Sequence, residues 1–121
     1  MGTEPAHTVT RYDQELDRLR GMVARMGGLV ERQTAQAIAA VVDQNEEAAL
    51  EPPELDPEVD ALEREAEALA IRILALSAPM AVDLRLIISV IKTTGDLARI
   101  GDYVSSIARR AIKVEPTDGA M

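Results

Sequence analysis

Two aspartates near the C-terminal end of the sequence are the side chains best suited to chemistry. Asp96 and Asp102 flank the segment Asp96-Leu97-Ala98-Arg99-Ile100-Gly101-Asp102. On a helix, residues six apart point about 120° away from each other, so these two carboxylates cannot easily hold one ion within a single helix. Each can contribute to a site shared with another helix or another subunit, and carboxylate oxygens suit Mg, Mn, Ca or Fe cations.

Each aspartate also has a simpler interpretation. Asp96 lies at helical neighbour spacing from Lys92 and Arg99, which favours a surface ion pair. Asp102 lies on an apolar stripe of the expected helix, where a buried carboxylate without a partner would be costly. A metal ligand and a solvated surface residue therefore both stay open for Asp102.

Other groups that carry chemistry are scarce in this sequence. His7 is the only histidine, and it lies in an N-terminal stretch without periodicity, where an imidazole is poorly positioned for phosphotransfer. The chain has no Cys, which excludes disulfides, thiolate catalysis and cysteine-bound metals. There is no Gly-rich phosphate loop and no catalytic triad. We expect a protein that is not an enzyme, and divalent or iron cations are the only cofactors that the sequence suggests.

The charge balance argues against two classes of partner. The chain has 21 Asp and Glu against 13 Lys and Arg, a formal net charge of −8. Binding of nucleic acid needs clustered cations, so we expect no nucleic-acid partner. No run approaches the roughly 20 apolar residues of a membrane span, and no signal-peptide pattern is present. We therefore expect a cytoplasmic protein without direct membrane insertion.

Hydrophobic periodicity predicts an all-α fold. Hydrophobic residues make up 47% of the chain, with no Trp or Phe, so the core must be aliphatic. Apolar residues recur at heptad spacing in three long segments, the pattern of helices that cross at shallow angles. We predict an antiparallel three-helix bundle over residues 9–113, with disordered ends at 1–8 and 114–121.

Prolines mark the expected helix boundaries. The first helix should begin after Thr8 or Thr10 as the N-cap and end near Asp43. Pro52-Pro53 should break the chain, because an interior proline costs a helix about 3 kcal/mol. The second helix should then start at Asp56-Pro57, with Asp at the N-cap and Pro in the first turn. The third should run from about residue 79 to 113.

The third segment carries two apolar stripes. The stripe expected to face the bundle consists of Leu86, Val90, Thr93, Leu97, Ile100, Val104, Ile107 and Ala111. A second stripe begins with four large apolar side chains and lies roughly opposite, namely Leu84, Ile87, Ile88 and Ile91. A lone bundle buries one broad face of each helix, so we expect this second stripe to be exposed until another surface covers it.

Several segments occur in an order that is typical of one protein family. Leu76-Ser77-Ala78-Pro79-Met80-Ala81-Val82-Asp83-Leu84-Arg85-Leu86-Ile87 is similar to a turn-and-helix signature, and the segment from Asp96 to Asp102 is similar to a second one. Tyr12-Asp13-Gln14-Glu15-Leu16, Met26-Gly27-Gly28-Leu29-Val30-Glu31 and Asp60-Ala61-Leu62-Glu63 match earlier parts of the same pattern. Across about residues 7 to 112 the chain resembles the first repeat of the PhoU family.

The resemblance implies a fold and a function. Family members are built from two tandem three-helix repeats and restrain the phosphate-starvation response in the cytoplasm. They act through the ATPase of the phosphate ABC transporter and its sensor histidine kinase, so we expect a non-enzymatic regulator of phosphate uptake with these partners. Arg85 and Arg99 are the side chains that we expect to contact a partner.

The resemblance also offers an alternative function. Some members bind multinuclear metal clusters through a carboxylate-x-x-x-aspartate motif, so a carboxylate bundle whose function is cation binding is the second hypothesis. The first carboxylate of that motif falls at Ala98 here, and only Asp102 is kept. The loss of one of two ligands should weaken a hard-cation site.

The second repeat of the family is absent from this sequence. Three explanations stay open: a fragment, a natural half-length member, or a protomer that pairs to rebuild the six-helix shape. Leu84, Ile87, Ile88 and Ile91 would pack against the partner repeat in a two-repeat protein. We therefore predict a homodimer that uses this stripe.

Overall fold

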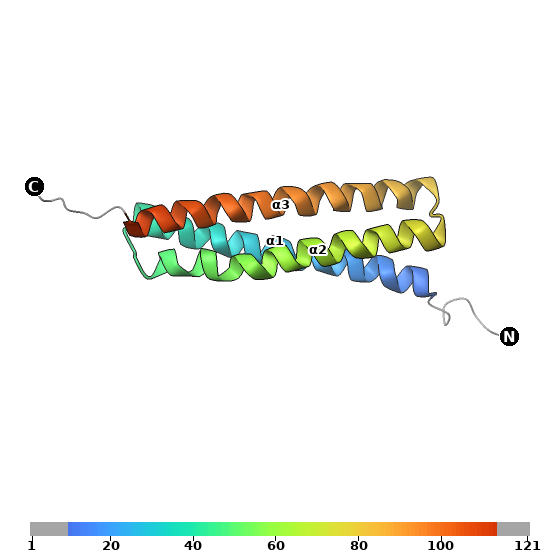
Figure 1. Ribbon diagram of the computed structural model, residues 1–121, viewed down its shortest axis with the longest axis horizontal. Coiled ribbons are helices and arrows are strands. Elements are labelled where there is room, and N and C mark those ends of the chain that lie inside the picture. Colours follow the sequence, from blue (N-terminus) through green and yellow to red (C-terminus); the bar gives the residue numbers. More distant parts are fainter. Residues whose placement is uncertain (1–9, 114–121) are drawn as a thin grey trace, which may run out of the picture.

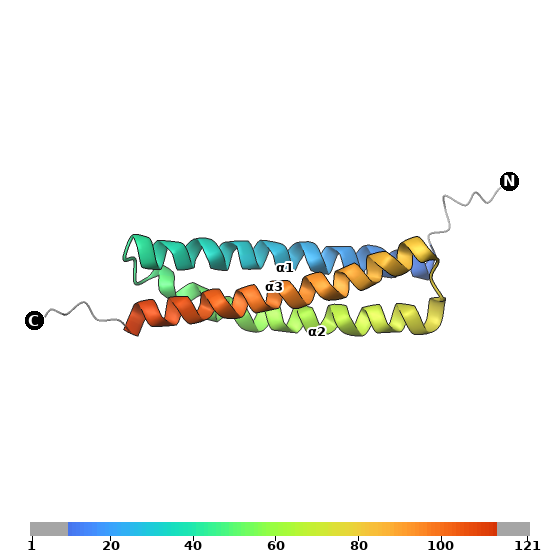
Figure 2. The ribbon, with the colours of Figure 1, turned by 90° about the horizontal axis from the view of Figure 1, so that it is seen from above.

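The computed structural model describes residues 10–113, and the expected disordered ends at 1–8 and 114–121 lie outside the described residues. Three long helices account for most of this range: α1 (Arg11–Val42), α2 (Glu51–Ser77) and α3 (Ala81–Lys113). A short 3₁₀ turn, η2 (Ala48–Leu50), connects α1 to α2. Figures 1 and 2 show the helices lying side by side along one long axis, each running opposite to its predecessor. The predicted all-α bundle is confirmed.

The ends of α1 follow the local sequence signals. Thr10 is the N-cap, and its hydroxyl accepts a hydrogen bond of 3.0 Å from the Asp13 N–H. The helix ends at Val42 with Asp43 as the C-cap, which confirms the predicted end near Asp43. At the same end of the bundle as Thr10, the Tyr12 hydroxyl donates a 2.6 Å hydrogen bond to Asp83 of α3. This contact ties the first turn of α1 to the first turn of α3.

The start of α2 differs from the prediction. The helix begins at Glu51, with Pro52 and Pro53 in its first turn and Pro57 inside the helix. First-turn prolines are tolerated because their missing N–H groups have no helical partner there. Arg32 of α1 donates two hydrogen bonds to Glu51, at 2.9 and 2.6 Å, and Pro52 is fully buried. These contacts help to offset the cost of an interior proline, and the helix begins six residues before Pro57, the predicted first position.

The main core is aliphatic and lies between the three helices. Its largest fully buried members include Leu19 and Met26 of α1, Val59 and Ile73 of α2, and Ile87 of α3. Burial of each such side chain contributes roughly 1.5–3 kcal/mol, which offsets much of the entropy lost on folding. Farther along the bundle, a smaller cluster of alanines packs where the helices approach near η2.

The buried face of α3 is shifted from the predicted seam. Thr93, Ile100 and Ile107 are exposed, although the periodicity places them in the core. The buried residues on this helix are Ile87, Val90, Thr94, Ala98, Gly101, Ser105 and Ala108. Most of these side chains are small. They let the neighbouring helices approach closely, so larger apolar side chains lie on the flanks instead.

The predicted outer stripe is therefore only partly correct. Ile87 is fully buried in the core, and Ile91 is partly buried against the same cluster. Leu84 and Ile88 remain 37% and 47% exposed. The expectation that all four side chains face away from the bundle is wrong, because α3 is rotated relative to the predicted seam.

Candidate metal centre

A buried polar network lies where α1, α2 and α3 meet. Gln33 of α1 is fully buried, and its amide nitrogen donates to the Pro52 carbonyl at 2.8 Å and to Asp56 at 3.2 Å. The Ser105 hydroxyl of α3 donates to the same Pro52 carbonyl at 3.1 Å. The side-chain oxygen of Gln33 has no hydrogen-bond partner within residues 10–113. A buried polar atom without a partner is costly, so this oxygen is available to a ligand.

Three carboxylates gather beside this network. One oxygen from each of Asp56, Asp60 and Asp102 lies within 4.8 Å of the others. Asp56 is 9% exposed, whereas Asp102 lies on the surface. Asp56 and Asp60 come from successive turns of α2, and Asp102 comes from α3. We call Asp56, Asp60 and Asp102 the carboxylate triad.

Gly101 permits the close approach that assembles this site. A Cβ atom at this position would lie 2.9 Å from the Gln33 side-chain oxygen and 3.0 Å from an Asp56 carboxylate oxygen. Contacts of that length are rarely seen for real Cβ atoms, so a larger residue here would have to displace the end of the Gln33 or Asp56 side chain. The α3 backbone thereby lies directly against Gln33 and Asp56.

The acidity of the site reflects crowding of negative charge. Burial raises the pKa of Asp56 to about 6, with a further contribution from its hydrogen bond with Asp102. Burial also raises the pKa of Asp60, and the charge of Asp102 adds to that effect. The pKa of Glu63 is raised chiefly by burial and then by the charge of Asp60. A cation among these carboxylates would relieve this repulsion.

The donor set fits a hard cation. Three carboxylates and a neutral amide oxygen are the ligand type of Mg²⁺, Ca²⁺ or Mn²⁺. A site that leaves some coordination positions open also suits Mg²⁺, because this ion usually keeps several of its bound waters. The triad and Gln33 are thus the residues that would hold a metal ion in this chain.

The sequence prediction found one member of this site. Asp102 belongs to the carboxylate triad. Asp96 does not, and it pairs instead with Arg99 on the exposed side of α3, the simpler interpretation offered above. Asp56, Asp60 and Gln33 were not predicted. The signal for two of them is present, since Asp56-Pro57-Glu58-Val59-Asp60 has the carboxylate-x-x-x-aspartate spacing, but Asp-Pro also favours a helix start.

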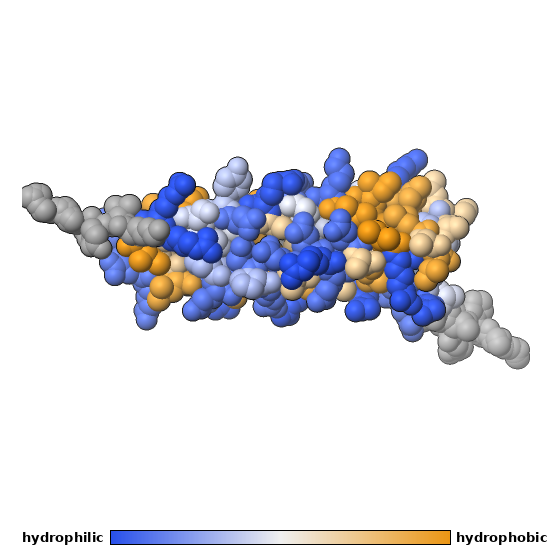
Figure 3. Space-filling model, in the orientation of Figure 1, coloured by the Kyte–Doolittle hydropathy of each residue, from blue (hydrophilic) through white to orange (hydrophobic). Residues whose placement is uncertain are grey.

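The other predicted residues lie on the surface of α3. Arg85 and Arg99 are exposed, with 69% of the Arg99 side chain accessible. Figure 3 shows hydrophilic residues over the middle of the face that carries α2 and α3, and a hydrophobic region toward the α2–α3 connection. Large exposed apolar residues at and near this connection include Leu76, Met80, Val82, Leu84 and Ile88.

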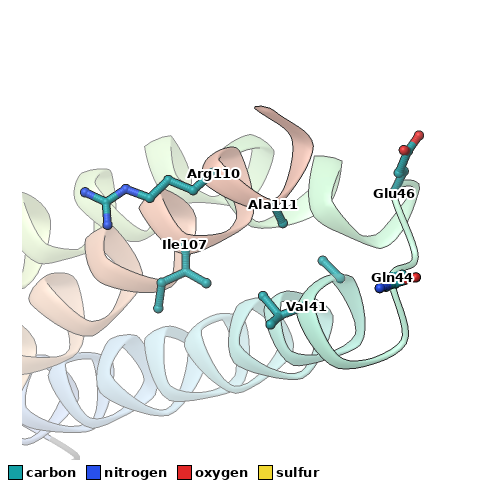
Figure 4. A pocket seen from close by; sticks show the side chains of 7 residues that line it. Val41, Gln44, Glu46, Ile107, Arg110 and Ala111 are labelled. Carbon is teal, nitrogen blue, oxygen red and sulfur yellow. The ribbon is translucent and has the colours of Figure 1, made fainter. Parts of the chain in front are cut away.

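A separate pocket of about 570 Å³ lies at the opposite end of the bundle, between the C-terminal parts of α1 and α3. Figure 4 shows Val41 and Ile107 pointing into this space, whereas the Arg110 guanidinium points away. Small-ligand sites usually combine an apolar lining with a few converging polar groups. This pocket has an apolar lining but lacks converging charged groups, so the carboxylate triad remains the candidate site.

The fold and the site together define a three-helix bundle with a carboxylate site between its second and third helices. The PhoU domain model matches residues 23–111. The chain therefore belongs to the PhoU family.

Comparison with curated relatives and with a solved structure extends this finding. The phosphate-specific transport system accessory protein PhoU homolog of Zymomonas mobilis is 44% identical over 108 residues, which cover 89% of this chain and 46% of that protein. The PhoU protein of Escherichia coli K12 is 36% identical over 107 residues, covering 88% and 44%. The crystal structure of PhoU from Pseudomonas aeruginosa superposes with a TM-score of 0.82 at 43% identity, covering 85% and 49%. The chain thus spans about half the length of the relatives it matches.

No helix within residues 10–113 is both long enough and apolar enough to cross a membrane.

Proposed function

We propose that this chain is a non-enzymatic regulatory unit of phosphate uptake and of the phosphate-starvation response. The observation that carries the proposal is the 36–44% identity to phosphate-specific transport system accessory proteins, which extends over nearly the whole bundle. In this proposal the chain works in the cytoplasm by contacts with the ATPase of a phosphate ABC transporter and with its sensor histidine kinase. It needs no catalytic group, because binding alone changes the activity of a partner.

Arg85 and Arg99 are the proposed contact residues. Both are exposed on α3 of a strongly acidic protein, where a guanidinium can bind a carboxylate of a partner through two hydrogen bonds. Charge reversal at such a position lowers affinity, chiefly by slowing association.

Pull-down of the purified transporter ATPase and of the cytoplasmic part of the kinase tests this role. We expect the wild-type chain to retain at least one of them, and Arg85→Glu to weaken retention. Arg18→Glu, an exposed charge reversal on α1, is the matched control and should behave as wild type. Failure of the wild-type chain to retain either protein would contradict the proposal.

Cation binding is the second candidate function, and the carboxylate triad favours it. Titration calorimetry with Mg²⁺ and Mn²⁺ measures binding directly. We expect Asp60→Asn and Asp102→Asn to abolish it and Asp96→Asn to leave it within about twofold, because only the first two remove a triad carboxylate. Equal loss in all three variants would indicate diffuse attraction to an acidic surface instead of a site.

We further propose that the chain forms a homodimer through the outer face of α3 near the α2–α3 connection. Leu84 and Ile88 remain exposed there, next to Met80 and Val82. A second copy would bring the assembly to about the length of one relative. Light scattering should give twice the mass of the chain, and Leu84→Glu with Ile88→Glu should give the monomer. A wild-type monomer at all concentrations would exclude the dimer.

A further inference from the structure

A shallow pocket of about 280 Å³ adjoins the carboxylate triad. It is lined by Arg99, Asp102, Tyr103 and Ser106. Asp102, Tyr103 and Ser106 follow Arg99 by three, four and seven positions, so all four residues share one face of α3. Asp102 belongs to both the pocket and the triad. Arg99, Tyr103 and Ser106 therefore line a pocket that shares Asp102 with the triad.

A cation at the triad would keep open coordination positions. Hard cations take six to eight oxygen ligands, and Mg²⁺ in proteins commonly combines one or two carboxylates with phosphate oxygens and water. The buried side of the site offers Asp56 and the unpartnered oxygen of Gln33, which is fully buried and lies beside Asp56. The side at Asp102 is exposed, and it opens onto the pocket. An additional ligand would reach the ion from there.

The pocket supplies the donors that a tetrahedral oxyanion requires. The planar guanidinium of Arg99 matches two oxygens of a phosphate, and the hydroxyls of Tyr103 and Ser106 can each donate one hydrogen bond. Arg99 pairs with Asp96, and with 69% and 63% of the two side chains accessible, this pair contributes little and is easily exchanged. The guanidinium is thus free to turn toward an anion.

An anion alone would be repelled from this pocket. Several negative charges lie nearby, on the triad, Asp96 and Glu63. The pocket lining itself contains one positive charge, that of Arg99. A divalent cation at the triad changes the balance and also offers a direct bond to an anion oxygen. The two ligands should therefore bind together.

We propose that the pocket of Arg99, Tyr103 and Ser106 binds inorganic phosphate, and that it does so only with a divalent cation held by the carboxylate triad. This inference rests on the second candidate function, cation binding at the triad. It would make phosphate a direct ligand of a phosphate-regulatory protein. By linkage, phosphate must strengthen cation binding by the same factor as the cation strengthens phosphate binding.

Equilibrium dialysis with radiolabelled phosphate tests the inference at constant ionic strength. We expect no retention of phosphate without Mg²⁺ and saturable retention with it. Arg99→Gln should weaken phosphate binding by about tenfold or more, since a charge-assisted bidentate contact is lost. Its affinity for Mg²⁺ without phosphate should change less than about twofold. Arg110→Gln, on the same helix but outside this pocket, is the matched control and should bind as wild type.

The outcomes separate this inference from the proposals on which it builds. If calorimetry shows Mg²⁺ binding but dialysis shows no phosphate, the phosphate site is wrong and the cation site stands. If neither ligand binds, the phosphate site and the cation site are both wrong. The pull-down of the transporter ATPase then still tests the regulatory role. Equal displacement of phosphate by sulfate, or equal loss in Arg99→Gln and Arg110→Gln, would also overturn the inference. Circular dichroism confirms that each variant is folded.

Discussion

Gly101 of α3 lies so close to Gln33 of α1 that a Cβ atom at position 101 would come within 2.9 Å of the Gln33 side-chain oxygen. Gln33 in turn holds the Pro52 carbonyl and Asp56 of α2 through its amide nitrogen. The glycine at position 101 therefore leaves the space that the ends of the Gln33 and Asp56 side chains occupy. The geometry of the candidate site depends on the packing of the whole bundle at this level.

Gly101→Ala should destabilise the protein although alanine is the better helix former. In an exposed helix the change gains about 1 kcal/mol, but here the new methyl group must displace Gln33 or Asp56 inside the bundle. We expect a net loss of about 1–2 kcal/mol in the free energy of unfolding, measured by urea denaturation. Gly95→Ala is the control, because its nearest neighbour is 3.9 Å away, at Glu63. It should be neutral or stabilising. Equal stability of the two variants would contradict the packing described for Gly101.

Gln33→Leu should cost about 1–3 kcal/mol of stability. Leucine has a similar size but removes the donor to the Pro52 carbonyl and to Asp56, which stay buried. Gln14→Leu, at an exposed position of the same helix, should change stability by less than about 0.5 kcal/mol. Urea denaturation of both variants measures the difference. A Gln33→Leu protein as stable as wild type would show that the buried network contributes nothing to folding.

Much of this fold follows from the sequence, and the candidate site follows from it only in part. Heptad spacing and the N-cap signal at Thr10 predict three helices and most of their ends. The rotation of α3 is less predictable, because Gly101 and Ser105 are weak hydrophobic signals that become buried only when neighbouring helices approach. Asp56 shows the same limit: beside Pro57 its local pattern favours a helix start, and its partner Asp102 lies 46 positions further along the chain.

The triad should make stability depend on pH between about 4 and 6. The pKa of Asp56 is raised in the folded protein to about 6 from a model-peptide value of 3.8, so the folded state binds its proton more tightly than the unfolded state does. Stability from this group is therefore highest at low pH and is lost as pH rises through the folded pKa. The raised pKa values of Asp60 and Glu63 act in the same direction.

Comparison of wild type with Asp56→Asn isolates this effect from the other titrating groups. Between pH 5 and 7 the wild-type protein should lose about 1 kcal/mol relative to the variant. Saturating Mg²⁺ should abolish that loss, because the ion stabilises the charged carboxylate. Parallel pH profiles for the two proteins would show that Asp56 titrates normally.

Ala98→Glu should have opposite effects on stability and on cation affinity. Ala98 is 5% exposed and belongs to the core, four positions before Asp102 on α3. A carboxylate introduced there must enter a largely apolar environment, which should cost about 2–4 kcal/mol without a cation. The same carboxylate adds a fourth acidic ligand beside the triad. Mn²⁺ affinity should therefore rise by about tenfold or more, which is roughly 1.4 kcal/mol of additional binding energy.

Ala108→Glu separates these two effects. Ala108 is fully buried on the same helix but lies in the smaller alanine cluster, outside the triad. It should destabilise the protein to a similar degree and leave Mn²⁺ affinity unchanged. Thermal unfolding with and without Mn²⁺ measures both quantities, because a ligand that binds only the folded state raises its stability by an amount that grows with the logarithm of the affinity. If Ala98→Glu gains no more from Mn²⁺ than Ala108→Glu does, position 98 is not adjacent to a cation site, and the assignment of the triad as a metal centre loses its support.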